Sequence, residues 1–142
     1  MIGLDCNVLV HLAFADHPAN SVTLAAVQAE TGRGSKLAFP SLDINEFLHV
    51  ATDPKRFNPP LTMTDALNWA EDFLANPMVE LIEPNRAATE QTLRWMHQFN
   101  LGRKRILDTH LAAILHTAGI NRLMTSNPGD FAVFGVVEVV AV

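Results

Sequence analysis

Four acidic residues occupy positions from which a carboxylate could take part in chemistry. Asp5 directly ends a short apolar stretch, Glu46 and Asp108 lie in early turns of helical patterns, and Asp130 lies in a polar turn after another apolar stretch. Each residue alone has an ordinary structural role, as a helix cap, a dipole partner or a turn residue. Carboxylates that meet in one crevice repel one another unless they bind cations. Their oxygen atoms suit Mg²⁺ or Mn²⁺, so the four acids predict a site for one or two such ions.

The elements that must position these acids alternate along the chain. Short apolar stretches predict strands, and apolar residues at helical spacing predict helices between them. This alternation predicts parallel strands joined by right-handed crossovers, and hence a three-layer α/β/α domain with a mostly parallel central sheet. In such a sheet, ligands bind outside the carboxyl ends of the strands. The expected strands are 1–4, 37–39, 79–82, 122–125 and 136–140, and the expected helices are 7–14, 18–30, 42–51, 64–75, 86–99 and 106–118, with Ser41 and Thr64 as caps of two of them.

Length and composition predict one domain that spans residues 1–142. Hydrophobic residues make up 49% of the chain and charged residues 18%, so burial can offset chain entropy without disulfides. The single cysteine, Cys6, lies beside the first predicted strand and is expected to be a buried thiol. The chain has neither a secretion signal pattern nor an apolar run of membrane-spanning length. We therefore expect a soluble cytoplasmic protein.

The charge distribution favours a local contact with a polyanion over a general one. The formal net charge is −5, which argues against broad adhesion to nucleic acid or to an anionic membrane. Basic residues nevertheless cluster in predicted loops, at Lys55-Arg56 and above all at Arg103-Lys104-Arg105. These clusters are either solvated loop charges or the basic rim of an acidic pocket. The second interpretation suits a metal-dependent enzyme in which two ions about 4 Å apart cleave a phosphodiester.

Four short motifs resemble a known family. They are Leu4-Asp5-Cys6-Asn7, Asn45-Glu46-Phe47, the stretch from Asp108 to Ala113, and the stretch from Thr125 to Phe131. In order, spacing and placement after predicted strands they look like the four acidic motifs of PIN-domain ribonucleases, specifically VapC-type toxins. The resemblance covers nearly the whole chain, and residues 52–61 are similar to a segment found in a subset of these toxins.

The resemblance implies a metal-dependent endoribonuclease. Asp5, Glu46 and Asp108 would be catalytic metal ligands, and Asn7 would orient them. The fourth ligand is open, because either Asp130 or a water held by Asn127 could complete the site, with help from Thr125 or Thr109. The family also implies a homodimer, a small antitoxin protein that blocks the site, and structured RNA as the substrate. The basic loop of Arg103, Lys104 and Arg105 is the expected RNA-binding segment.

Two other kinds of function are compatible with parts of the pattern. A PIN domain can instead act on DNA or flap structures, or serve as a non-catalytic binding subunit. A signalling receiver domain also binds Mg²⁺ at acidic strand ends, but it needs paired acids after the first strand and a lysine near the last strands. This chain has one acid at the first place and no lysine beyond Lys104.

Overall fold

A parallel sheet of five strands forms the centre of the molecule. The computed structural model describes residues 1–142 and contains β1 (Ile2–Leu4), β2 (Leu37–Pro40), β3 (Val79–Ile82), β4 (Arg122–Thr125) and β5 (Glu138–Ala141). The strand order is β3-β2-β1-β4-β5, and every neighbouring pair is parallel. The predicted α/β class is confirmed, and the sheet is parallel throughout.

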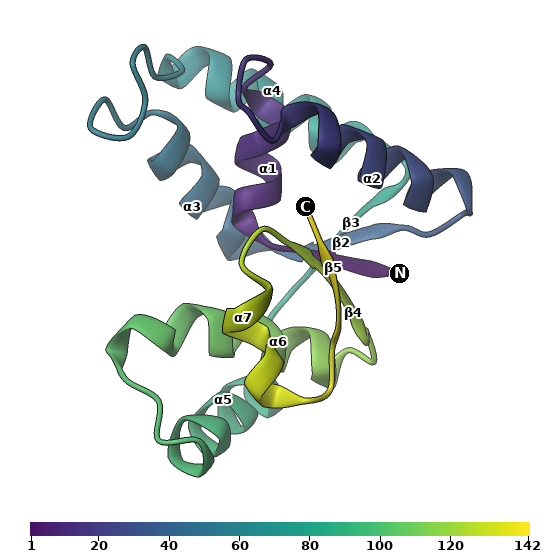
Figure 1. Ribbon diagram of the computed structural model, residues 1–142, viewed down its shortest axis with the longest axis vertical. Helices are drawn as coiled ribbons and strands as arrows, with labels where there is room; N and C mark the ends of the chain where they lie inside the picture. Colours follow the sequence, from purple (N-terminus) through teal and green to yellow (C-terminus); the bar gives the residue numbers. More distant parts are fainter.

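Helices cover both faces of the sheet (Figure 1). One layer consists of α1 (Cys6–Ala13), α2 (Asn20–Gly32), α3 (Ser41–Ala51) and α4 (Met63–Ala75). The other consists of α5 (Arg86–Gln98), α6 (Ile106–Thr117) and the short α7 (Pro128–Phe131), with single 3₁₀ turns η1 (Arg103–Arg105) and η2 (Ala132–Phe134). The three predicted layers are therefore present.

The alternation of side chains along β1 explains why two separate cores form. Ile2 and Leu4 are fully buried and pack with α1, α3 and α4 in one core, while the residue between them points to the opposite face. That residue is Gly3, and a Cβ atom there would lie 2.5 Å from Cδ1 of Leu115 in α6. A glycine is favoured at this position because the side chain of Leu115 packs directly against the backbone of β1.

Several predicted element boundaries were wrong, among them those of α2, which spans residues 20–32 instead of 18–30. Three others have a local cause. Thr62, not Thr64, caps α4 by accepting a hydrogen bond from the Asp65 amide at 3.1 Å. Ser41 is the first residue of α3 rather than its cap, and its hydroxyl donates to Glu83 at 2.8 Å. The last strand begins at Glu138 instead of Val136, because Val136 and Val137 pack against the second core before pairing with β4 begins.

The carboxyl ends of the central strands lead directly into the helices that carry the acids. β1 leads into α1 at Asp5, β2 leads into α3, and β4 leads into the turn that precedes α7. None of the helices is both long and apolar enough to cross a membrane.

Candidate functional site

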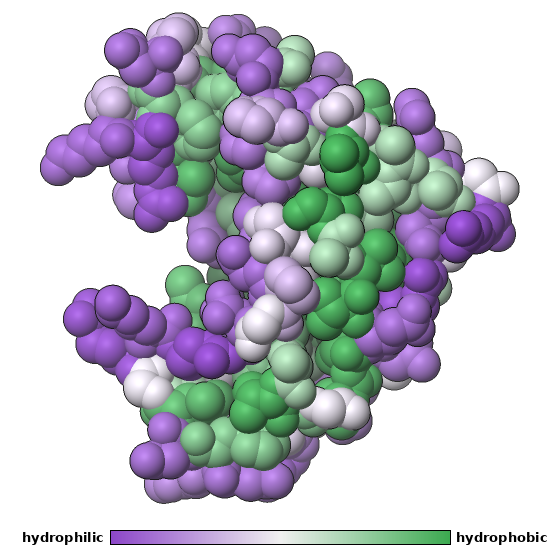
Figure 2. Space-filling model, in the orientation of Figure 1, coloured by the Kyte–Doolittle hydropathy of each residue, from purple (hydrophilic) through white to green (hydrophobic).

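A deep cleft opens at the carboxyl edge of the sheet, between the two helical layers. Figure 2 shows this hollow on one side of the molecule, with hydrophilic residues at the tips of both walls. The loop after α3 forms one tip and the loop before α6 forms the other (Figure 1). The floor of the cleft contains two adjoining cavities that share three acidic residues, Asp5, Glu46 and Asp108.

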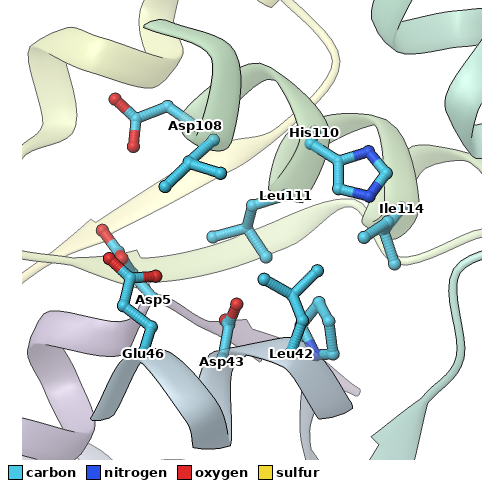
Figure 3. Close-up of a pocket in the computed structure, with 10 residues that line it drawn as sticks. Asp5, Leu42, Asp43, Glu46, Asp108, His110, Leu111 and Ile114 are labelled. Atoms are coloured by element: carbon cyan, nitrogen blue, oxygen red, sulfur yellow. The ribbon is translucent and has the colours of Figure 1, made fainter. Parts of the chain in front are cut away.

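Three of the four acids that the motifs predicted therefore come together. Asp5 follows β1, Glu46 comes from α3 in one layer, and Asp108 comes from α6 in the other (Figure 3). Asp108 reaches the floor from the first turn of its helix, where a carboxylate also interacts favourably with the helix dipole. This placement explains why residues far apart in the sequence can act at one point.

Asp5 is held in a fixed orientation by two neighbours. Its Oδ2 accepts hydrogen bonds from Asn7 Nδ2 at 2.7 Å and from Thr125 Oγ1 at 2.6 Å. Asn7 is itself fixed, because its Oδ1 accepts a hydrogen bond from the Ser126 amide at 3.2 Å. Both contacts fall on one oxygen of Asp5, which leaves Oδ1 free of these partners. Such an arrangement orients a carboxylate toward a ligand.

The shared electrostatics of the acids favour cation binding. Burial raises the pKa of Asp5 despite the two hydrogen bonds, and burial together with the charge of Asp5 raises the pKa of Glu46. Burial and the charges of Asp5 and Asp130 raise the pKa of Asp108 to about 6. Each acid is thus harder to ionise because the others are near, and a cation between them would remove that penalty.

Asp43 is a further acid that the sequence analysis missed. It lies one helical turn before Glu46, is 4% exposed, and lines the smaller cavity, which we call the inner cavity, together with Asp5, Glu46 and Asp108 (Figure 3). Its Oδ2 has no hydrogen-bond partner. Burial and the charges of Glu46 and Asp5 raise its pKa to about 8. The spacing of three residues from Glu46 was the available signal, since residues i and i+3 share a helix face.

The inner cavity has room for one ion without its hydration shell. Its volume is about 30 Å³, and a site needs roughly 10–15 Å³ to admit one water molecule. The unpartnered oxygen of Asp43 and the carboxylates of Asp5, Glu46 and Asp108 provide hard oxygen donors. In the present side-chain positions, no group of three or more His, Cys, Asp and Glu side chains forms a coordination cluster. The donor chemistry therefore fits Mg²⁺ or Mn²⁺, while a closed coordination shell is not preformed.

The two residues considered for the fourth ligand lie in different places. Asn127 lines the larger cavity, and its backbone N–H donates to Thr125 Oγ1 at 3.0 Å. Asp130 lines neither cavity, although its charge acts on Asp108. Thr109 is fully buried and donates its hydroxyl to the Arg105 carbonyl at 2.6 Å, so it supports α6 from within.

The predicted RNA-binding loop divides into two kinds of residue. Arg103 and Lys104 are exposed at the wall of the cleft. Arg105 is half-buried, donates to the backbone carbonyl of Asp130, and has its Nε 3.9 Å from Oδ2 of Asp108. Arg105 therefore connects α6 to α7 and partly offsets the charge of Asp108.

Comparisons with known proteins identify the fold. No protein-family model matches the sequence, and neither does any curated protein sequence. Among solved structures, VapC20 of Mycobacterium tuberculosis, described as a sarcin-ricin loop cleaving toxin, aligns with a TM-score of 0.73 at 15% identity over 98% of both chains. A chain of VapBC2 from Rickettsia felis, solved bound to a promoter DNA fragment, aligns with a TM-score of 0.67 at 18% identity over 99% of this chain and 98% of that one. The chain therefore has the PIN-domain fold of VapC toxins along nearly its whole length.

Proposed function

We propose that this protein is a divalent-metal-dependent endoribonuclease and the toxin of a toxin–antitoxin pair. The observation that carries the proposal is the convergence of Asp5, Glu46 and Asp108 on the floor of one cleft. The likeness to VapC20, whose description is that of an RNA-cleaving toxin, supports RNA as the substrate. The likeness to a VapBC2 chain supports an antitoxin partner.

The chain's own residues have distinct roles in the proposed reaction. Asp5, Glu46 and Asp108 would hold Mg²⁺ or Mn²⁺, with Asn7 and Thr125 fixing the orientation of Asp5. Asp43 faces the same cavity and would complete the oxygen donors on the α3 side. Asn127 is better placed than Asp130 to hold a water at the fourth position, because it lines the larger cavity. A divalent cation held there would activate water and stabilise the leaving oxygen of a phosphodiester.

The charge distribution around the cleft suits an RNA backbone. Four exposed basic residues lie on its two walls, Lys55 and Arg56 after α3 and Arg103 and Lys104 in η1. A protein with a net charge of −5 would repel RNA over most of its surface. Basic walls around an acidic floor would confine RNA to the cleft, with a phosphate directed to the acids.

Sequencing of RNA 5′ ends after expression of the protein without an antitoxin tests this function. We expect new ends at a restricted set of positions, and none with the Asp5→Ala variant at equal protein level. Identical RNA ends in the two cultures would contradict the proposal.

The second candidate is a PIN domain that acts on DNA or serves only to bind nucleic acid. Purified protein incubated with matched RNA and DNA strands, each with Mg²⁺ and with EDTA, separates the candidates. Our proposal predicts Mg²⁺-dependent cleavage of RNA. Cleavage of DNA alone would identify a DNA nuclease, and binding without cleavage would identify a binding subunit.

A further inference from the structure

The larger cavity extends well beyond the acids. Its volume is about 320 Å³, within the range of cavities that hold small organic molecules. Asp5, Glu46, Asp108 and Asn127 line one part of it, and the rest of the lining is contributed mainly by α1, the turn after α1 and the loop after α3. We call this remaining part the outer pocket and define it by His11, His17, Arg56 and Phe57.

We propose that the outer pocket is a subsite for one unpaired nucleotide of the RNA strand, with His17, the outer ring of the stacked histidine pair, contacting the base and Arg56 contacting a phosphate. This inference rests on the proposed nuclease function and adds the part of the site that recognises the substrate. It also predicts that the protein prefers a single-stranded segment over a duplex.

The two histidines form a flat surface suited to a base. Their rings are stacked, with centroids 4.4 Å apart and planes inclined at 26°. Burial and the neighbouring His17 lower the pKa of His11, which keeps that ring neutral at pH 7. Unpaired RNA bases stack on planar side chains, histidine included. The stacked pair therefore offers an aromatic face beside the acids.

Existing hydrogen bonds leave one nitrogen of His17 free for a base. The Nδ1 of His17 accepts a hydrogen bond from the Ala19 amide at 3.0 Å, so the neutral ring carries its proton on Nε2. No partner within the protein is found for that Nε2. The Nδ1 of His11 lies 3.3 Å from the Thr23 hydroxyl, which fixes the ring beneath His17. His17 thus provides both a stacking face and one N–H donor.

Arg56 provides the positive charge on the same side of the cleft. Its side chain is 64% exposed, and its ion-pair partner, Asp53, is 3.8 Å away, too far for a strong contact. Arg56 lines the same cavity as Glu46 and Asp108, so its charge lies beside the acidic floor. A guanidinium with most of its donors free is well suited to bind a phosphate.

Phe57 holds this loop against the body of the protein. Its ring stacks on Phe14, with centroids 4.2 Å apart and planes inclined at 18°. Phe14 is buried at the end of α1, and the amides of Arg56 and Phe57 both donate to the Asp53 carbonyl at 3.1 Å. Packing of Phe57 and these backbone hydrogen bonds therefore fix the backbone of Arg56 at the pocket, so the loop needs little reordering when a nucleotide binds.

Binding of a fluorescent single-stranded RNA hexamer to protein carrying Asp108→Asn tests the subsite, because this background removes cleavage. We expect His17→Ala to weaken binding about 5- to 150-fold, the range for loss of one stacked base. His17→Phe should restore part of the affinity, since it keeps the planar face but lacks the N–H donor. Arg56→Gln should weaken binding about 3- to 10-fold and reduce its salt dependence. Arg86→Gln, on the exposed surface of α5, is the matched control and should leave binding unchanged.

Each possible outcome decides for or against the subsite. Binding by His17→Ala equal to that of its parent would overturn the proposal, and so would a loss that His17→Phe does not restore. Equal affinity of the parent for the hexamer and for its duplex would also overturn it. The assay measures binding in a variant expected not to cleave RNA. It can therefore refute the nucleotide subsite without refuting RNA cleavage by the wild-type protein. Conversely, hexamer binding with the expected variant pattern would stand even if the wild-type protein cleaved nothing.

Discussion

At the residue scale, the site consists of buried and half-buried acids that share one unfavourable charge environment. Burial raises the pKa of Asp5, Asp43, Glu46 and Asp108, and the ion pair that Arg105 forms with Asp108 is long, at 3.9 Å. The sequence motifs identified three of these acids because each follows or closely follows a strand. Asp43 was missed because an acid at position three of a helix is also an ordinary dipole partner, and only its burial distinguishes it.

The stability of the metal-free protein should fall as pH rises from about 5 to 8. Asp108 and Asp43 have folded-state pKa values of about 6 and about 8, both above the value of 3.8 for a free aspartate. At these two carboxyls the folded state binds more protons than the unfolded state over this range, so their deprotonation favours unfolding. Thermal unfolding in EDTA should show a decrease in Tm of several degrees, and saturating Mg²⁺ should recover more of it at pH 8 than at pH 5. A Tm in EDTA that is constant or rises over this pH range would contradict the raised pKa values of Asp43 and Asp108.

Asp43→Asn should stabilise the metal-free protein at pH 8 and weaken Mg²⁺ binding. The substitution keeps the shape of the side chain and removes a buried charge that has an unpartnered oxygen. We expect a gain in the free energy of unfolding that is larger at pH 8 than at pH 5, since the cost of burying this carboxyl rises with pH up to its folded-state pKa of about 8. Asp72→Asn, on the exposed face of α4, is the matched control and should change neither quantity. Unchanged Mg²⁺ affinity of Asp43→Asn by calorimetry would place Asp43 outside the ion's surroundings.

At the element scale, the order of strands and helices could be predicted from the sequence, and the boundaries only in part. The ranges of β3 and β4 were correct because short apolar runs are bounded there by polar or turn residues. The start of α4 was wrong because Thr62 and Thr64 are both acceptable caps in sequence terms, and the actual cap is decided by the path of the preceding proline-rich loop. The close packing of α6 on β1 at Gly3 could not be predicted from the residues around Gly3, because it depends on Leu115, 112 positions away.

Gly3→Val should separate α6 from β1 and destabilise the protein. A Cβ at residue 3 would lie 2.5 and 2.7 Å from the two methyl groups of Leu115, which is fully buried. Overpacking of this kind costs about 1–3 kcal/mol. Urea unfolding at neutral pH measures the cost, and Gly129→Val is the control because a Cβ there meets nothing within 4 Å. Equal midpoints for the two variants would show that the β1–α6 contact is looser than described.

At the scale of the whole molecule, the two helical layers form the walls of one cleft and the sheet edge forms its floor. The fold and the meeting of three acids were predictable because carboxyl ends of parallel strands share an edge. The outer pocket was not predictable, because it is built from α1 and a loop about 40 residues further along the chain. The homodimer that the family resemblance implies stays a prediction of the sequence.

Arg103→Gln combined with Lys104→Gln should weaken RNA binding and lower its salt dependence. Both side chains are exposed on the wall of the cleft opposite Arg56, whereas Arg105 is excluded because it supports Asp108 and Asp130. Loss of two phosphate contacts should reduce the slope of log K against log salt by about 1.4 for a single strand. The double variant Arg86→Gln, Arg94→Gln removes the same charge from α5 and should leave the slope unchanged. If the two double variants had equal slopes of log K against log salt, Arg103 and Lys104 would be solvated loop residues that do not contact RNA.

One measurement tests the central claim most directly. It is the rate of RNA cleavage by purified protein as the Mg²⁺ concentration is varied, compared between wild type and Asp108→Asn at pH 7.5. The claim is that Asp5, Glu46 and Asp108 together hold the ion that cleaves RNA. We predict a rate that rises to saturation with Mg²⁺, is absent in EDTA, and falls at least about 100-fold in the folded Asp108→Asn variant. Undiminished cleavage in EDTA, or by Asp108→Asn, would contradict it.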